Sequence, residues 1–156
     1  MEEKFVELRT VLHGHGRVGI DTSIFIYQLE GSGWSAAAAS AVLTALGNGA
    51  FVGITSLVTL TELAVKPLQL GRPDIADEYD ALLGALANLV IVQPDRATAR
   101  RAAELRAGHR LSLADAFQIA SCLQLGATAF LTNDRRLRRV TELEVVLLDD
   151  FASEQR

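Results

Sequence analysis

The stretch that decides the fold is RVGIDTSIF, residues 17 to 25. Its apolar run Val18–Ile20 is typical of a buried β-strand, and Asp21 follows at the carboxyl end of that strand. TAFLTND, residues 128 to 134, repeats the pattern, with an apolar run to Leu131 and Asp134 just beyond it. Ligands of open α/β sheets bind outside the carboxyl ends of strands, so we expect the two acids to meet at one edge of a sheet.

Five apolar runs of strand length alternate with helical patterns along the chain. The runs have apolar residues at consecutive positions, as strands do when helices cover both faces of a parallel sheet. The expected strands are Val18–Ile20, Phe51–Ile54, Leu89–Val92, Ala129–Leu131 and Val145–Leu148. The alternation predicts right-handed crossovers and an α/β fold, a three-layer α/β/α sandwich with a mainly parallel central sheet of about five strands.

Helix signals lie between these runs. Ser35–Leu46 is rich in alanine, Pro73 opens a pattern that extends to about Ala87, and Asp95 is placed to cap a helix that continues to Ala107. We expect residues 1–15 to be an N-terminal extension with one or two helical turns and a flexible break at HGHG. Residues 16–156 are expected to form a single domain.

The composition excludes several classes of protein. Hydrophobic residues make up 49% and charged residues 22%, which is close to the globular average and unlike a disordered or fibrous chain. The longest apolar stretches are only strand-length, and MEEKFVELRT has acids where a signal peptide needs basic and apolar residues, so we expect a cytoplasmic protein. A net charge of −4 argues against a generally basic nucleic-acid-binding surface. The one cysteine, Cys122, is expected in the core.

GHGRVG, residues 14 to 19, matches the glycine spacing of dinucleotide-binding loops. These glycines precede the strand, whereas phosphate binding needs them between a strand and the helix that follows. We therefore interpret the match as accidental and predict no nucleotide cofactor. His13, His15 and His109 are expected to be surface residues.

Three aspartates have an ordinary structural alternative to a functional role. Asp21 and Asp134 each precede a predicted helix, and an aspartate there is equally suited to capping free backbone N–H groups. Ser112 and Asp115 resemble a capping box, in which Glu or Gln is the usual partner because Asp is too short to reach back well. The carboxylate of Asp115 is then available for another task.

Glu62 is the fourth candidate. It lies on a predicted helix opened by Thr55 or Ser56, in a largely apolar segment where Lys66 is the one nearby cation. Solvent exposure is the ordinary explanation, and a buried glutamate would need a partner. The four acids together carry more weight than each alone, because crowded carboxylates repel unless a cation neutralises them. An oxygen-only site without His or Cys favours Mg²⁺ or Mn²⁺ over zinc.

The segments GIDTSIFIY, TSLVTLTELA, LSLADAFQIASCLQLGATAFLTNDRRL and VVLLDDF resemble a PIN-domain protein, from about residue 17 to residue 151. The proportions are similar to those of the VapC toxins of bacterial toxin–antitoxin pairs. The resemblance implies a Mg²⁺- or Mn²⁺-dependent endoribonuclease with an acidic centre of Asp21, Glu62, Asp115 and Asp134. It also implies a homodimer, an RNA substrate and an antitoxin whose C-terminal segment lies in a groove leading to the acids.

Further residues are assigned second-rank roles. Thr22 or Ser23 and Asn133 occupy positions where PIN proteins often have supporting polar groups. Arg135 and Arg136 follow Asp134 directly and are candidates for binding the RNA backbone, although solvated helix faces explain such arginines equally well. The alternatives are a free-standing PIN nuclease in RNA processing and a non-catalytic binding module. An aspartyl-phosphate phosphatase is disfavoured, because Ser23 stands where its second Asp is needed.

Overall fold

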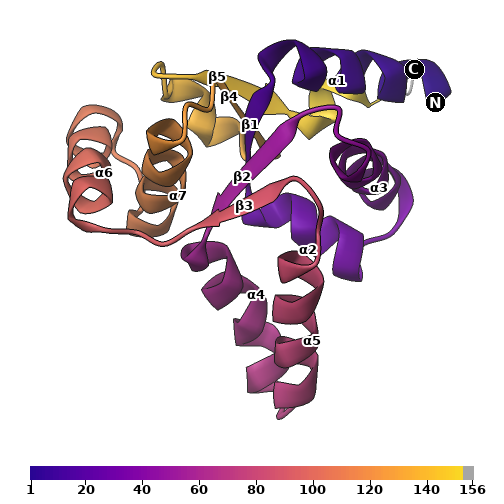
Figure 1. Cartoon of the computed structure of the whole chain (residues 1–156), viewed down its shortest axis with the longest axis horizontal. Helices are drawn as coiled ribbons and strands as arrows, with labels where there is room; N and C mark the ends of the chain where they lie inside the picture. The colour runs from indigo at the N-terminus through magenta and orange to yellow at the C-terminus, as the bar shows by residue number, and fades with distance from the viewer. Residues whose placement is uncertain (153–156) are drawn as a thin grey trace.

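The computed structural model describes residues 1–152 and contains a five-stranded sheet in which every pairing is parallel. The strands lie in the order β3-β2-β1-β4-β5 (Figure 1). Their bounds are β1 Arg17–Ile20, β2 Val52–Ser56, β3 Leu89–Val92, β4 Ala129–Thr132 and β5 Glu144–Leu147. All five predicted strands are confirmed: β3 has the predicted bounds, and the ends of the others differ by two residues at most.

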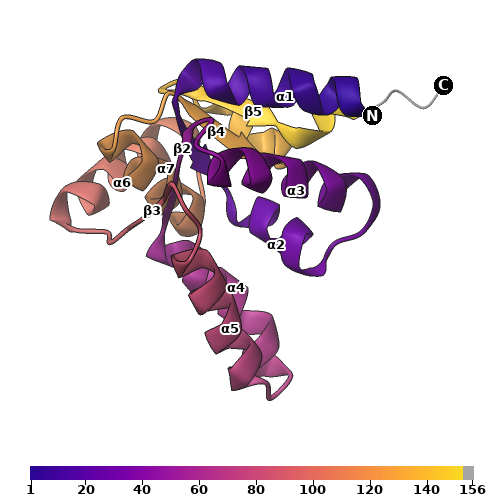
Figure 2. The ribbon, with the colours of Figure 1, turned by 45° about the vertical axis from the view of Figure 1, so that its right-hand side comes forward.

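Helices cover both faces of the sheet, which confirms the predicted three-layer sandwich. One core cluster joins the sheet to α1, α2 and α3, and a second joins its other face to α6 and α7. The helices α4 and α5 pack against each other and project beyond the sheet (Figures 1 and 2). The bounds are α1 Glu2–His15, α2 Thr22–Glu30, α3 Gly33–Gly47, α4 Leu57–Gln69, α5 Pro73–Gly84, α6 Arg96–His109 and α7 Leu113–Gln124. Two short 3-10 helices follow, η1 Arg135–Arg139 and η2 Leu148–Phe151.

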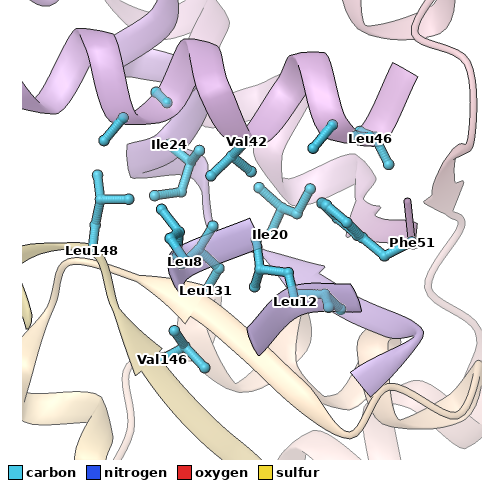
Figure 3. Close-up of a cluster of buried hydrophobic side chains, with 14 of the residues drawn as sticks. Leu8, Leu12, Ile20, Ile24, Val42, Leu46, Phe51, Leu131, Val146 and Leu148 are labelled. Atoms are coloured by element: carbon cyan, nitrogen blue, oxygen red, sulfur yellow. The ribbon is translucent and has the colours of Figure 1, made fainter. Parts of the chain in front are cut away.

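Alternate residues of the strands divide between the two core clusters. Ile20 and Leu131 point toward α1 and α3, among the side chains drawn in Figure 3, whereas Phe130 belongs to the cluster beneath α7. Gly19 permits this helix to approach the central strand, because a Cβ atom there would lie 2.6 Å from both Cys122 Sγ and Phe130 Cδ2. Cys122 is fully buried, as predicted.

The N-terminal segment is more ordered than the sequence analysis predicts. Residues 2–15 form one 14-residue helix, α1, so the prediction of one or two turns and a flexible break is wrong. The helix buries Phe5, Leu8 and Leu12 in the larger core cluster, and Gly16 ends it with a φ of 75°. Its packing depends on tertiary contacts, because its apolar residues are too few to form a strong stripe in the sequence.

The histidines are only partly as predicted. His13 is exposed, and its Nδ1 lies 2.7 Å from the Ala50 carbonyl oxygen. His15 and His109 are partly buried, and each pairs with a glutamate at the surface. The division into an extension, residues 1–15, and a domain, residues 16–156, stays a prediction whose last four residues lie outside the described part. Within residues 1–152, no helix is both long and apolar enough to cross a membrane.

Candidate metal and nuclease site

The candidate site lies where the strand order changes direction. From β1 the chain proceeds to β2 and β3 on one side, and β4 then pairs with β1 on the other. Ile20 is paired with Leu131, and the Asp21 N–H donates to the Leu131 carbonyl at 2.9 Å. The carboxyl ends of β1 and β4 therefore end side by side, as predicted. Such a switch point opens a crevice in which open α/β sheets bind their ligands.

Asp21 occupies the N-cap position of α2, but its side chain does not cap that helix. Its Oδ2 instead accepts hydrogen bonds from Thr132 Oγ1 at 2.7 Å and Ser23 Oγ at 3.0 Å. The capping alternative for Asp21 is therefore wrong. One polar group from β4 and one from α2 hold the carboxylate at the junction of the two strands.

Burial raises the pKa of Asp21 to about 6, and repulsion from Asp115 and Glu62 adds to the rise. The hydrogen bonds from Thr132 and Ser23 act in the opposite direction, because they favour the charged carboxylate. At neutral pH the Asp21 side chain is thus ionised, and this ionisation lowers the stability of the folded protein. An enclosed carboxylate that feels two others is the electrostatic setting that a bound cation relieves.

Glu62 reaches the site from the middle of α4 and remains exposed. Its Oε1 accepts from Thr22 Oγ1 at 2.8 Å and from Gln118 Nε2 at 2.9 Å. Lys66, the one cation that the sequence offered, pairs with Glu30 instead. The carboxylate of Glu62 is therefore oriented by neutral donors, and its second oxygen makes no hydrogen bond within the described residues.

A buried network behind Glu62 contains two residues that the sequence analysis missed. Gln118 Nε2 lies 2.6 Å from Thr22 Oγ1 and 3.0 Å from Thr59 Oγ1. The hydroxyl of Thr59 is also hydrogen-bonded to the hydroxyl of Thr55. The spacing was a weak signal: Gln118 is three residues after Asp115 and Thr59 is three before Glu62, so each shares a helix face with an acid. Thr132, two residues before Asp134, was missed as well.

Asp115 lies in the first turn of α7. Ser112 caps that helix by accepting from the Asp115 backbone N–H at 3.1 Å, as predicted. The carboxylate of Asp115 makes no hydrogen bond within the described residues, and the helix N-terminus favours its negative charge. The expectation that this side chain remains available is therefore met.

Asp134 is the most strongly engaged of the four acids. Its Oδ1 caps η1 by accepting from the Arg136 N–H at 3.0 Å, which confirms the capping alternative. The Arg136 guanidinium binds both carboxylate oxygens, at 3.0 and 2.7 Å, and holds the pKa of Asp134 below its usual range. Arg136, a predicted RNA contact, is thus paired within the chain, whereas Arg135 is exposed.

The predicted supporting residues have different surroundings. Thr22 and Ser23 contact Glu62 and Asp21 directly. Asn133 instead links two neighbouring elements: its Nδ2 donates to Tyr27 Oη at 3.1 Å and its Oδ1 accepts from the Asp149 N–H at 3.0 Å. The contacts of Asn133 indicate a role in holding α2 and η2 next to the end of β4.

The chemical type of the ligand atoms at the site suits a hard divalent cation. These atoms are carboxylate and hydroxyl oxygens, which Mg²⁺ and Mn²⁺ prefer, and the raised pKa of Asp21 shows that negative charge there is poorly compensated. Within residues 1–152, however, no three His, Cys, Asp or Glu side chains form a group able to hold one ion. The acids are thus not gathered into a three-ligand group in this part of the chain. Arg136 binds Asp134, and donors of the buried network bind Glu62.

These features define an α/β protein with several acidic side chains near the switch point of a parallel sheet. The family model of the PIN domain matches residues 18–143, and the chain belongs to this family. No curated protein matches the sequence significantly. A crystal structure of VapBC2 from Rickettsia felis bound to a promoter DNA fragment is similar, with a TM-score of 0.66, 16% identity, and coverage of 83% of this chain and 97% of that chain. A toxin–antitoxin complex from Klebsiella pneumoniae gives a TM-score of 0.60, 21% identity, and coverage of 84% and 97%.

Proposed function

We propose that this protein is an endoribonuclease that depends on Mg²⁺ or Mn²⁺ and acts as the toxin of a toxin–antitoxin pair. The observation that carries the proposal is the half-buried Asp21 carboxylate, which Thr132 and Ser23 hold at the β1–β4 switch point, with Asp115 and Glu62 close enough to raise its pKa. Membership of the PIN family supports nuclease chemistry, and the two structural neighbours support a toxin. An RNA substrate is inferred from the resemblance to VapC proteins.

The four acids are assigned different tasks. Asp21 and Asp115 hold the cation, because the first is fixed by Thr132 and Ser23 and the second has a free carboxylate. When bound, Mg²⁺ or Mn²⁺ makes a water molecule more acidic and offsets negative charge on the phosphate oxygens. Asp134 contributes a further carboxylate beside Arg136.

Glu62 is assigned the orientation of the attacking water. Thr22 and Gln118 fix its Oε1, so the other oxygen is held in one direction and is able to accept a proton from that water. Gln118 and Thr22 are thus positioning residues that act through Glu62.

The metal requirement is tested with purified full-length protein and a labelled single-stranded RNA. We expect cleavage with Mg²⁺ or Mn²⁺, none in EDTA, and recovery when Mn²⁺ is added back. Asp115→Asn is expected to lose about 100-fold or more of the rate, since metal-ion catalysis contributes several kcal/mol. Circular dichroism checks that the variant is folded. Asp80→Asn, at an exposed position of α5, is the matched control. Cleavage in EDTA, or a wild-type rate in Asp115→Asn, contradicts the proposal.

A groove beside the acids supports an antitoxin partner. It lies between α4 and α7, has a volume of about 450 Å³, and is lined by Val58, Thr61, Pro94, Leu113, Ala114 and Phe117. Thr61 precedes Glu62 and Ala114 precedes Asp115 in the sequence, so the groove borders the two helices that carry these acids. Leu113 is 58% exposed in the free chain, and an apolar segment of a partner would cover it.

A second apolar surface supports a homodimer. Val65, Leu68 and Leu70 on and after α4, together with Leu82 on α5, are exposed on the projecting helix pair. Large exposed apolar side chains are frequent in protein interfaces. We assign this surface to a second copy of the chain.

Both partners are tested by size-exclusion chromatography with light scattering. The free chain is expected at twice its 16.8 kDa mass, and the product of a short reading frame beside the gene is expected to copurify with it. Leu113→Asp is expected to release that product, because it introduces a charge into the apolar groove. Val6→Asp, at an exposed position of α1, is the control. A monomeric wild type contradicts the dimer, and equal copurification with both variants contradicts the groove.

A further inference from the structure

A small polar cleft lies beside the acids, between the end of α6, the start of α7 and η1. Its volume is about 130 Å³, and its charged lining residues are Arg110, Asp115, Asp134, Arg136 and Arg139. We call it the arginine cleft. It brings three guanidinium groups next to two of the four acids of the proposed site.

The charges of the arginine cleft do not cancel. Asp134 and Arg136 neutralise each other. Arg139 donates through Nε to the Arg136 carbonyl and forms no ion pair with a carboxylate within residues 1–152. Arg110 makes no side-chain hydrogen bond or ion pair in that range, and Asp115 is the remaining anion. Two guanidinium groups thus face one carboxylate, which favours an added anion.

Other arginines of the same region form ion pairs with carboxylates. Arg100 and Arg101 on α6 both pair with Glu104, and Arg138 on η1 pairs with Asp150. The two pairs on α6 are what solvated helix faces ordinarily show. Arg110 and Arg139 differ from them in that neither forms an ion pair with a carboxylate of the described chain, although Asp134 lies close enough to Arg139 for its pKa to be lowered by that charge.

The backbone of Arg110 adds an independent observation. It ends α6 in the left-handed region, with φ 55° and ψ 43°, and its N–H donates to the Arg106 carbonyl. Glycine or asparagine usually occupies such a helix end, and the remaining left-handed residues of the described chain are five glycines and Asn88. An arginine there costs about 1 kcal/mol relative to glycine. The left-handed backbone does not require an arginine. A cation there complements the C-terminal end of the helix dipole, and the same side chain also lines the arginine cleft.

We propose that the arginine cleft is a binding site for a phosphate of RNA, held by Arg110 and Arg139 beside the acidic site. The proposal rests on the nuclease function and names how that site holds its substrate. A phosphodiester needs cationic partners to approach a group of carboxylates, and planar guanidinium groups bind phosphate oxygens through paired N–H donors. Arg136 lines the same cleft but is already paired with Asp134.

The test measures binding of a fluorescein-labelled single-stranded RNA by fluorescence anisotropy, in EDTA so that no metal-dependent cleavage occurs. Arg110→Asn removes the charge and keeps a residue that suits the left-handed backbone. We expect binding to weaken about tenfold, and the slope of log K against log salt to fall by about 0.7, the value for one phosphate contact with a single strand. Thermal melting should show a variant at least as stable as wild type.

Arg100→Gln, on the same helix, is the matched control and should retain RNA binding. The proposal is overturned if Arg110→Asn and Arg100→Gln bind RNA equally well, or if wild type does not bind RNA. RNA binding that is unchanged in Arg110→Asn would point to an acidic protein segment as the occupant of the cleft. The two proposals fail separately. If wild type binds RNA with the expected variant pattern yet does not cleave it with Mn²⁺, the nuclease function falls and the phosphate site stands.

Discussion

Asp21→Asn is expected to abolish RNA cleavage and, at the same time, to make the metal-free protein more stable. Its carboxyl group is enclosed at the β1–β4 junction, where burial raises its pKa to about 6. At pH 8 the folded protein must therefore ionise a group that resists ionisation. Asparagine keeps an oxygen that accepts from Thr132 and Ser23, and it carries no charge.

The pH dependence follows from the direction of this shift. The unfolded chain loses the proton near 3.8 and the folded chain near 6, so between these values the folded form binds more protons. The stability that Asp21 contributes is complete below about 3.8, falls as the pH rises through the window, and stays low above it. A pKa shift of this size corresponds to a loss of roughly 1 to 3 kcal/mol in the free energy of unfolding. The lower values allow for the contact with solvent that the residue retains, which screens the effect.

Urea unfolding in EDTA measures the effect at two pH values. At about pH 8 the free energy of unfolding of Asp21→Asn should exceed that of wild type by roughly 1 to 3 kcal/mol, and at pH 3.5 the two should nearly coincide. Asp80→Asn should follow wild type at both. A variant that is less stable than wild type at pH 8 would show that Asp21 is not a strained ionised group.

The activity of Asp21→Asn tests the same residue by its function. Loss of a direct ligand removes several kcal/mol of transition-state stabilisation, so the cleavage rate with Mn²⁺ should fall by about 10³-fold. A stable but inactive variant separates this effect from misfolding. A variant that cleaves RNA at more than a tenth of the wild-type rate would remove Asp21 from the site.

Leu12→Ala is expected to produce the largest loss of stability. Leu12 is fully buried between α1 and the sheet, among the side chains drawn in Figure 3. Truncating a buried leucine costs about 2 to 5 kcal/mol, because apolar contacts are lost and a cavity remains. For a chain of this length, each 1 kcal/mol lowers the melting temperature by about 2 to 4 °C.

The matched control for Leu12→Ala is Val6→Ala on the same helix. Val6 is 50% exposed, and alanine has the higher helix propensity, so this variant should melt at or slightly above the wild-type temperature. Differential scanning calorimetry distinguishes the two. If both variants melt at the same temperature, α1 does not contribute to the cooperative core, contrary to the burial of its leucines.

The sheet was predictable from the sequence because its strands are buried on both faces. A short, continuous apolar run such as Ala129–Leu131 is typical of a strand buried on both faces. The alternation of such strands with helices predicts the three layers. The placement of Asp21 beside Leu131 followed from the rule for strand ends. The free carboxylate of Asp115 followed from the chemistry of Ser112 as a cap.

Other features depended on contacts that no local pattern encodes. Helix α1 docks through Leu8 and Leu12, and the sequence alone does not show which surface receives them. Gln118 looked like an ordinary helix residue, because its role arises only where α4, α2 and α7 meet. The ion pair of Asp134 with Arg136 also changes the expected site, since it compensates one of the four acids.

The most direct test of the central claim, that these acids hold a divalent cation, is a Mn²⁺ titration of the full-length protein followed by electron paramagnetic resonance, which detects the free ion. At about pH 7.5, wild type and Asp80→Asn are expected to bind Mn²⁺ equally, and Mg²⁺ should displace it. Asp21→Asn and Asp115→Asn should lose most of this binding while remaining folded. Wild type that leaves all Mn²⁺ free, or variants that bind as wild type does, would contradict the account.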